Sequence, residues 1–255
     1  MSRRFLVLCL VIPIALACQS ASDHASHDHA DWSYEGATGP DHWGDLDPDY
    51  ALAKTGREQS PINIETGGVT EESRPEIVVD YHPTTLDIIN NGHTLQDNYT
   101  GGGSIEIDGH RYELAQFHVH APSEHTIDGR HAAAEMHFVH TDEDDNLAVI
   151  AVMIVEGAQN AFVERVRRYV PREPGRASHV EGMLVDASEL LPSNLASYRY
   201  AGSLTTPPCS EGVRWIVLKE PIEASREQLD QLRATIPKNN RPTQPLNDRK
   251  VVATE

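Results

Sequence analysis

Hydrophobic and polar positions alternate with a period of two in several stretches of the chain. Because successive side chains of a strand point to opposite faces, this period predicts β-strands that each bury one face. The stretches are residues 105–107 with 110–112, 116–120, 135–140, 147–155 and 213–218. Gly-rich and acidic segments, TGGG at 100–103 and TDEDDN at 141–146, separate the strands and predict turns.

Helical periodicity is sparse. Two segments, 161–170 and 225–236, have apolar residues at helical spacing and are each followed by a proline. In the second segment, Ser225 and Gln228 fit a capping box. The pattern predicts a mostly β (α+β) domain with a few peripheral helices.

The N-terminus has the layout of a secretory signal. Arg3 and Arg4 precede an apolar run at 5–17 that is too short to span a bilayer. The run ends in ALAC, which resembles the lipobox of bacterial lipoproteins, where cleavage leaves a lipidated Cys18. We expect a signal peptide at 1–17 and an exported protein, a periplasmic or cell-envelope lipoprotein, with plain secretion as the alternative.

The segment 18–31 is small and polar, and it predicts a flexible tether behind Cys18. Its histidines, His24, His27 and His29, could bind a metal loosely or belong to a solvated spacer. From residue 32 to 255 there is no internal repeat and no second linker. One domain, 32–255, is therefore expected.

The composition limits the partners. The chain has 255 residues and a formal net charge of −18. Such an acidic surface repels nucleic-acid phosphates and anionic headgroups, so we expect no nucleic acid and membrane contact only through the lipid at Cys18. Whether the protein is a monomer or a homodimer stays open. Of the three cysteines, only Cys209 lies inside the domain, which excludes an intradomain disulfide.

Two segments, QFHVHAPSEH at 116–125 and AAAEMHFVH at 132–140, are rich in histidine. In a strand, Gln116, His118 and His120 share one face, and Glu135 shares a face with His137. If the strands are neighbours, three imidazoles converge and leave one tetrahedral position open, which is typical of catalytic rather than structural zinc. Gln116 and Glu135 could then accept the second ring N–H of His118 and His137. The alternative is a set of scattered surface and core histidines.

Several motifs, in order, resemble the signature segments of the α-class carbonic anhydrases, of the bacterial secreted or lipoprotein type. They are QFHVH at 116–120, SEHT at 123–126, AEMHFVH at 134–140 and SLTTPP at 203–208, flanked by YEGATGPDHWGDL, GREQSPINI, NNGH, WIVLKEPI and NNRPTQPLNDR. The resemblance runs from about Trp32 to Arg249. It implies a single domain with a central, largely antiparallel twisted β-sheet and a few short helices.

The resemblance also implies a ligand set and an activity. His118, His120 and His137 would bind one Zn²⁺ per chain, with water or hydroxide as the fourth ligand. In carbonic anhydrases the metal lowers the pKa of that water to about 7. The implied reaction is the reversible hydration of CO₂ to bicarbonate and a proton, by zinc-hydroxide attack with a histidine proton shuttle. The alternatives are a non-catalytic binding module on the same fold, and a zinc esterase side activity.

Further roles follow from the same resemblance. Thr205 would donate its hydroxyl proton to Glu124 and orient the hydroxide. His93 would be the proton shuttle. The residues expected to hold the intervening water chain are Tyr34, Asn91 and Gln96. The residues expected to line the CO₂ pocket are Val139, Val149, Leu204, Thr206, Val213 and Trp215.

One feature departs from the family pattern. Bacterial relatives often join a cysteine at the position of Cys209 to one shortly before the QSPINI segment, but here the upstream stretch reads DYALAKTGREQ. The resemblance therefore implies a free thiol at Cys209 and no loss of a catalytic group. The absent bridge puts stability in question, since losing a native disulfide costs about 2–5 kcal/mol.

Overall fold

The computed structural model describes residues 30–254. The predicted signal peptide at 1–17, the lipidation site Cys18 and the tether histidines His24, His27 and His29 lie outside the described residues. Within the described range, no helix is both long and apolar enough to cross a membrane.

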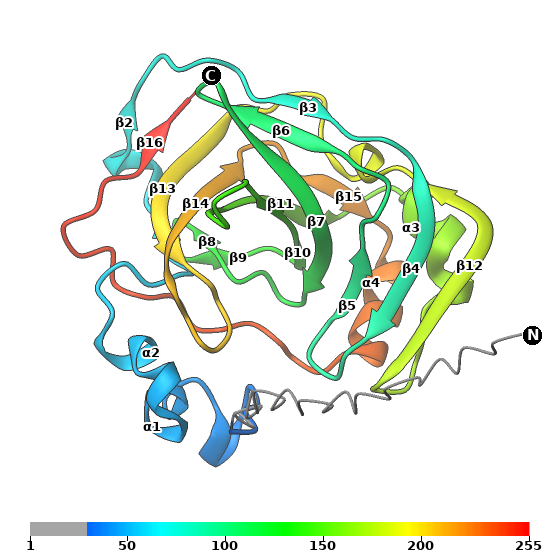
Figure 1. The fold of residues 1–255 in the computed structure, drawn as a ribbon, viewed down its shortest axis with the longest axis horizontal. Coiled ribbons are helices and arrows are strands. Elements are labelled where there is room, and N and C mark those ends of the chain that lie inside the picture. Colours follow the sequence, from blue (N-terminus) through cyan, green and yellow to red (C-terminus); the bar gives the residue numbers. More distant parts are fainter. Residues whose placement is uncertain (1–29, 255) are drawn as a thin grey trace, which may run out of the picture.

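A twisted, mixed β-sheet organises the protein (Figure 1). Among the described residues it has 13 strands, and most neighbouring pairs are antiparallel. Along the sheet the strands are β12 (Arg176–Val185), β4 (Thr84–Asn90), β5 (Leu95–Asn98), β7 (His110–His120), β10 (Ala134–Thr141), β11 (Leu147–Glu156), β14 (Glu211–Leu218), β13 (Ser197–Ser203), β16 (Val252–Ala253) and β2 (Thr70–Glu71). β11 is parallel to β14, which makes the sheet mixed.

Shorter elements complete the fold. β6 (Ser104–Ile107) joins β7 to β3 (Val78–Asp80), and β15 (Ile222–Ala224) pairs with β11. A second, small sheet contains β1 (Asn63–Ile64), β8 (Thr126–Ile127) and β9 (Arg130–His131). The α-helices are α1 (Trp43–Leu46), α2 (Leu52–Thr55), α3 (Ala161–Val166) and α4 (Arg226–Thr235), and 3₁₀ turns cover Gly36–Thr38, Pro48–Tyr50, Thr66–Gly68, Arg167–Tyr169 and Ala187–Leu190.

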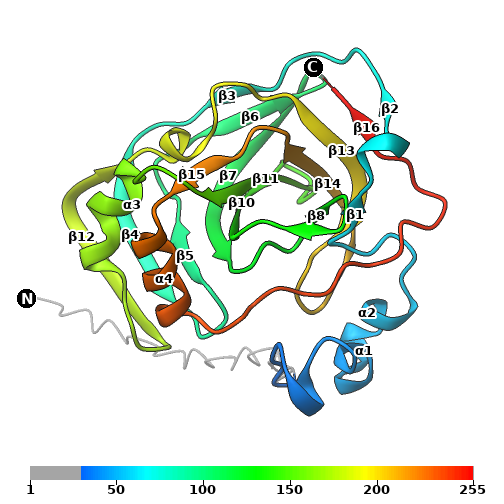
Figure 2. The ribbon, with the colours of Figure 1, turned by 180° about the vertical axis from the view of Figure 1, so that it is seen from behind.

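The two faces of the sheet have different surroundings, because successive side chains of each strand point to opposite faces. On β10, Met136 and Phe138 point into the main core, which α3 and α4 help to enclose. Both helices lie together beside β4, β5 and β12 in each view (Figures 1 and 2). The side chain of His137 points to the other face, beside a second apolar cluster that contains Val149 and Trp215.

The predicted elements are confirmed, with different bounds. The segments 110–112 and 116–120 belong to one continuous strand, β7. The helix predicted at 161–170 is α3 followed by the 3₁₀ turn Arg167–Tyr169. The helix predicted at 225–236 is α4, and Ser225 and Gln228 form the expected capping box. The pattern did not predict the other strands, among them β4, β5, β12 and β13.

Candidate metal centre

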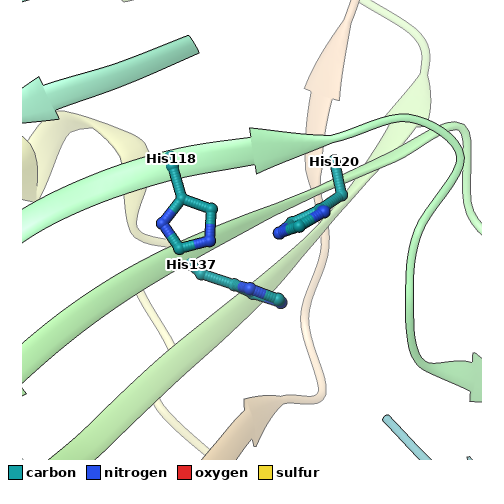
Figure 3. Close-up of side chains that lie close together, drawn as sticks. All are labelled: His118, His120 and His137. Carbon is teal, nitrogen blue, oxygen red and sulfur yellow. The ribbon is translucent and has the colours of Figure 1, made fainter. Parts of the chain in front are cut away.

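Three imidazoles converge on one face of the sheet (Figure 3). His118 and His120 lie on β7, and His137 lies directly opposite His118 on the antiparallel neighbour β10. One ring nitrogen from each histidine lies within 4.8 Å of the other two. The two-residue period of β7 and its register with β10 together produce this cluster.

Hydrogen bonds fix which nitrogen each ring turns inward. His118 donates from Nδ1 to Gln116 Oε1 at 2.8 Å, and His120 donates from Nδ1 to the backbone oxygen of Asn239 at 2.7 Å. Both rings therefore keep the lone pair of Nε2 for another partner. His120 Nε2 is buried and makes no hydrogen bond within residues 30–254, which is the condition of a ligand atom.

His137 has the opposite tautomer. Its Nε2 donates to Glu135 Oε1 at 2.9 Å, so its Nδ1 carries the free lone pair. Glu135 is two positions away on the same strand and the same face. Gln116 and Glu135 thus contact the rings that the sequence pattern assigned to them.

The electrostatic environment keeps these rings neutral. Burial lowers the pKa of His118 well below its usual value, and the neighbouring His120 and His137 lower it further. Burial also lowers the pKa of His120 to about 4, and that of His137 below its usual value. Neutral imidazoles are the form that binds metal, and three of them with one open position suit catalytic zinc.

A second group, His125, Glu135 and His137, also places ligand-type atoms close together. The carboxylate oxygens of this group already accept hydrogen bonds. Glu135 Oε1 accepts from His125 Nδ1 at 2.6 Å as well as from His137, and Oε2 accepts the backbone N–H groups of Glu124 and His125 at 2.7 and 2.8 Å. This group therefore orients the side chain of His137 and does not form a separate metal site.

Glu124 lies beside the cluster in the segment that follows β7. Its Oε1 accepts the backbone N–H of Arg241 at 2.8 Å, and its Oε2 lies 3.5 Å from His120 Nε2 and 3.9 Å from His137 Nδ1. Burial raises the pKa of Glu124 to about 7, although His137 and the Thr205 side chain favour the ionised form. Thr205 is buried. No hydrogen bond of ordinary length reaches Glu124 Oε2 from the described residues.

Apolar side chains form the wall beside the histidines. Val139 on β10, Val149 on β11 and Trp215 on β14 occupy matching positions of three adjacent strands. The Trp215 ring lies edge-on to His137, with centroids 4.9 Å apart, and its Nε1 donates to the backbone oxygen of Ser203 at 2.9 Å. Val213 and Leu204 belong to the same cluster, and the neighbouring Thr206 is partly buried.

His93 lies in the turn between β4 and β5. Its ring stacks on Trp32, with centroids 3.8 Å apart and planes 11° apart, and partial burial lowers its pKa. Asn91 Oδ1 accepts the backbone N–H groups of His93 and Thr94, both at 2.9 Å, so its side chain shapes this turn. The Trp32–His93 stack was not predicted.

The other two residues expected on the proton path have different environments. Gln96 on β5 lies opposite His118 on β7, and its side-chain amide donates to Asn98 Oδ1 at 2.8 Å. The Tyr34 hydroxyl is buried and makes no hydrogen bond in the described part of the chain. Burial raises the pKa of Tyr34 well above its usual value, with a further contribution from Glu124.

The segment NNRP at 239–242 supports the centre in a way that the sequence pattern did not reveal. Asn239 accepts from His120 through its backbone oxygen, and its side-chain amide donates to the backbone oxygens of His93 and Val119 at 2.9 and 3.0 Å. Arg241 is 1% exposed and its backbone N–H binds Glu124. One segment therefore ties the turn of His93 to the metal-facing strand.

Within residues 30–254, Cys209 is buried and forms no disulfide. Burial raises the pKa of its thiol to about 11. The Pro207–Pro208 bond in the adjoining loop is cis.

Comparison with known proteins finds similarity to carbonic anhydrases. Residues 38–255 match the family model described as eukaryotic-type carbonic anhydrase. A carbonic anhydrase of Pectobacterium atrosepticum is 43% identical over 237 residues, which cover 92% of this chain and 95% of that protein. A carbonic anhydrase of a Nostoc species is 42% identical over 224 residues, covering 87% and 85% of the two chains.

A solved structure is similar over almost its whole length. It is the complex of α-carbonic anhydrase from Thermovibrio ammonificans with the inhibitor sulfanilamide, and it is 49% identical to this chain with a TM-score of 0.85. The match covers 88% of this chain and 99% of that one. The twisted sheet with few helices is therefore the α-carbonic anhydrase fold.

Proposed function

The chain belongs to the eukaryotic-type carbonic anhydrase family and is a carbonic anhydrase, and on this premise we propose that one Zn²⁺ ion at His118, His120 and His137 serves the reversible hydration of CO₂. The observation that carries the proposal is the convergence of three neutral ring nitrogens, one of which is buried and has no hydrogen-bond partner in the described part of the chain. A bound zinc ion supplies Lewis acidity, which in this family brings the pKa of water to about 7.

The proposed role of Thr205 and Glu124 is orientation. The Thr205 hydroxyl donates a hydrogen bond to the Glu124 carboxylate, and its oxygen accepts a hydrogen bond from the attacking group. That group keeps a lone pair directed at the substrate, and such positioning lowers the barrier. The position of Glu124 Oε2, 3.5 Å from His120 Nε2, supports this role because the carboxylate faces the centre of the cluster.

The apolar wall beside the histidines is proposed to hold CO₂. Its residues are Val139, Val149, Leu204, Val213 and Trp215, with Thr206 at its edge. The substrate is uncharged and apolar, so it gains more from a desolvated surface than from hydrogen bonds. The contact between the Trp215 and His137 rings supports this assignment, since it places the wall next to a proposed zinc ligand.

His93 is proposed to carry the released proton to solvent, with Tyr34, Asn91 and Gln96 along the water chain between it and the metal. A histidine whose pKa is lowered by burial is neutral at pH 7, so it is ready to accept a proton. The stack on Trp32 supports the role because it holds the ring in one orientation at the edge of the site.

Zinc content and CO₂ hydration, measured together on each variant, test the proposal. We expect about one zinc per chain, and we expect His137→Ala to lose zinc and stopped-flow hydration activity together. His179→Ala is the matched control, because that side chain is 68% exposed on β12. Full hydration activity in zinc-free His137→Ala would overturn the assignment, and zinc binding without hydration would favour a non-catalytic binding module.

Kinetic measurements with two substrates distinguish the esterase alternative from CO₂ hydration. We propose that ester hydrolysis is at most a side activity, since Glu124, the carboxyl group beside the cluster, is assigned to orienting the attacking group through Thr205 and not to protonating an ester leaving group. Steady-state kinetics with a phenyl ester and with CO₂ on the same preparation compare the two. A kcat/KM for the ester above that for CO₂ would refute the ranking.

We also propose that the protein is exported and anchored through lipid on Cys18 after cleavage behind residue 17. The support is the basic and apolar pattern of residues 3–18. Cell fractionation and mass spectrometry of the N-terminal peptide test the proposal, with Cys18→Ser expected to release the protein from the membrane fraction. An unmodified Cys18 would contradict it.

A further inference from the structure

A cavity of about 250 Å³ lies at the strands β13, β14 and β16. Four cationic side chains line it, Arg74, Arg199, Arg214 and Lys250, and no acidic residue of the described range is among the lining residues. Trp215, whose ring contacts His137, is also a lining residue, but strand alternation directs Arg214 to the face opposite that ring, and the histidines 118, 120 and 137 are not among the lining residues. The cavity is therefore separate from the candidate metal centre.

The arginines share one carboxylate at the edge of this cavity. Asp108 Oδ2 accepts from Arg214 Nη2 at 2.7 Å and lies 3.5 Å from Arg74 Nη1, while Oδ1 lies 3.8 Å from Arg199 Nη1. Arg74 also pairs with Glu72 at 2.8 Å. Among the described residues, the ion pairs of the three arginines involve two carboxylates, Asp108 and Glu72, and Lys250 adds a fourth cation. The cavity therefore has a local positive surplus in a chain of net charge −18.

Arg199 carries an unsatisfied donor. The residue is 8% exposed, and its Nη1 makes no hydrogen bond within residues 30–254. Its other groups are engaged, because Nε donates to Ser197 Oγ at 3.1 Å and Nη2 donates to the Pro75 backbone oxygen at 3.4 Å. A buried guanidinium N–H without an acceptor is unfavourable, and the cations of Arg74 and Arg214 repel it further.

A bound oxyanion would satisfy the free N–H of Arg199 and reduce the repulsion between the cationic side chains. Its oxygens accept hydrogen bonds from planar guanidinium groups, and its charge neutralises the surplus. We propose that the cavity lined by Arg74, Arg199, Arg214 and Lys250 binds a small oxyanion with two negative charges, such as phosphate or sulfate. Neither the metal centre nor its proposed reaction requires this site.

Calorimetric titration of the full chain with inorganic phosphate, at constant ionic strength set by sodium chloride, tests the proposal. Arg214→Gln removes a charge-assisted hydrogen bond and is expected to weaken phosphate binding about tenfold. Arg199→Gln is expected to act in the same direction. Asp108→Asn removes the competing carboxylate and is expected to tighten binding. Asn suits this position because the φ of Asp108 is 55°, in the left-handed region that Asn adopts readily.

Arg226→Gln is the matched control, since it removes the same charge from an arginine that is 75% exposed and paired with Glu156 elsewhere. Thermal unfolding of each variant shows whether it is folded, and Arg214→Gln and Asp108→Asn keep the test intact if Arg199→Gln is not. Equal affinity in all variants would place phosphate at another site, such as the metal centre, and overturn the proposal. Equal weakening by Arg226→Gln and Arg214→Gln would also overturn it, because binding would then follow net charge alone.

Discussion

Replacing the buried acid Asp97 with Asn is expected to stabilise the protein, and by an amount that depends on pH. Asp97 is 2% exposed and lies on β5 beside an apolar cavity of about 120 Å³ that α3 and α4 help to enclose. Its Oδ2 accepts the backbone N–H of Asp87 at 3.2 Å, and its Oδ1 has no hydrogen-bond partner among residues 30–254. Burial, with a smaller contribution from the charge of Asp87, raises the pKa of Asp97 to about 7.

The magnitude follows from proton linkage. The ordinary pKa of Asp is 3.8, so between about pH 4 and pH 7 the unfolded chain loses this proton while the folded chain keeps it. Over that range, the free energy of unfolding falls by about 1.4 kcal/mol for each pH unit. Asp97 therefore costs about 4 kcal/mol of stability above pH 7 and nothing below pH 4. Asp97→Asn cannot ionise, so it is expected to match the original chain at pH 4 and to exceed its stability by up to that amount at pH 8.

Urea unfolding, followed by tryptophan fluorescence from pH 4 to pH 8, measures the difference between the two proteins at each pH. Other titrating groups cancel in that difference, and excess chelator in both samples removes the contribution of bound metal. Asp230→Asn, at an exposed position of α4, is the control and is expected to show little pH-dependent gain. A stability difference for Asp97→Asn that stays constant from pH 4 to pH 8 would refute the reasoning.

Three further predictions concern the candidate site. His93→Ala is expected to slow CO₂ hydration in weak buffer by about 10²-fold, the lower range for a positioned proton carrier, and added imidazole should restore the rate in stopped-flow assays; a rate independent of buffer would remove the shuttle role. Thr205→Val is expected to keep its zinc, measured by metal analysis, while kcat/KM falls by about 10²-fold because the attacking group loses its orientation. Cys209 is buried, and burial raises the pKa of its thiol to about 11, so iodoacetamide should modify it only after unfolding, as peptide mass spectrometry can show. Modification of Cys209 in the folded protein would contradict this burial.

The strands around the candidate site were predictable because their signal is local. Polar and apolar side chains alternate over 116–120 on β7 and 135–138 on β10, and both stretches lie on the same side of the register shift between Val139 and His140. The faces of His118, His120 and His137 therefore follow from the sequence alone. The beginning of α4 was predictable for a similar reason, since Ser225 and Gln228 cap the helix within a single turn. Each of these features depends on residues a few positions apart.

The unpredicted features depend on distant segments or on weak patterns. β12 is an edge strand with mostly exposed or half-exposed residues, so its sequence carries little alternation. The Trp32–His93 stack joins segments about sixty residues apart, and the partner of His120 Nδ1 is a backbone oxygen, which has no signature in the sequence. Tertiary packing therefore determined these contacts, and alternation could not indicate them.

Asp97 is an ionisable side chain on the buried, apolar face of β5, and the sequence pattern that predicts the other face of the strand does not reveal it. Gln96 and Asp97 are adjacent on β5, so the alternation that puts Gln96 opposite His118 also directs Asp97 to the opposite face, where it lines the apolar cavity. In the sequence, the polar run QDN before the TGGG segment looks like the approach to a surface turn. In the folded chain its middle residue faces the core. Because the cost of Asp97 arises on the face away from the histidines, Asp97→Asn should change stability without changing zinc affinity.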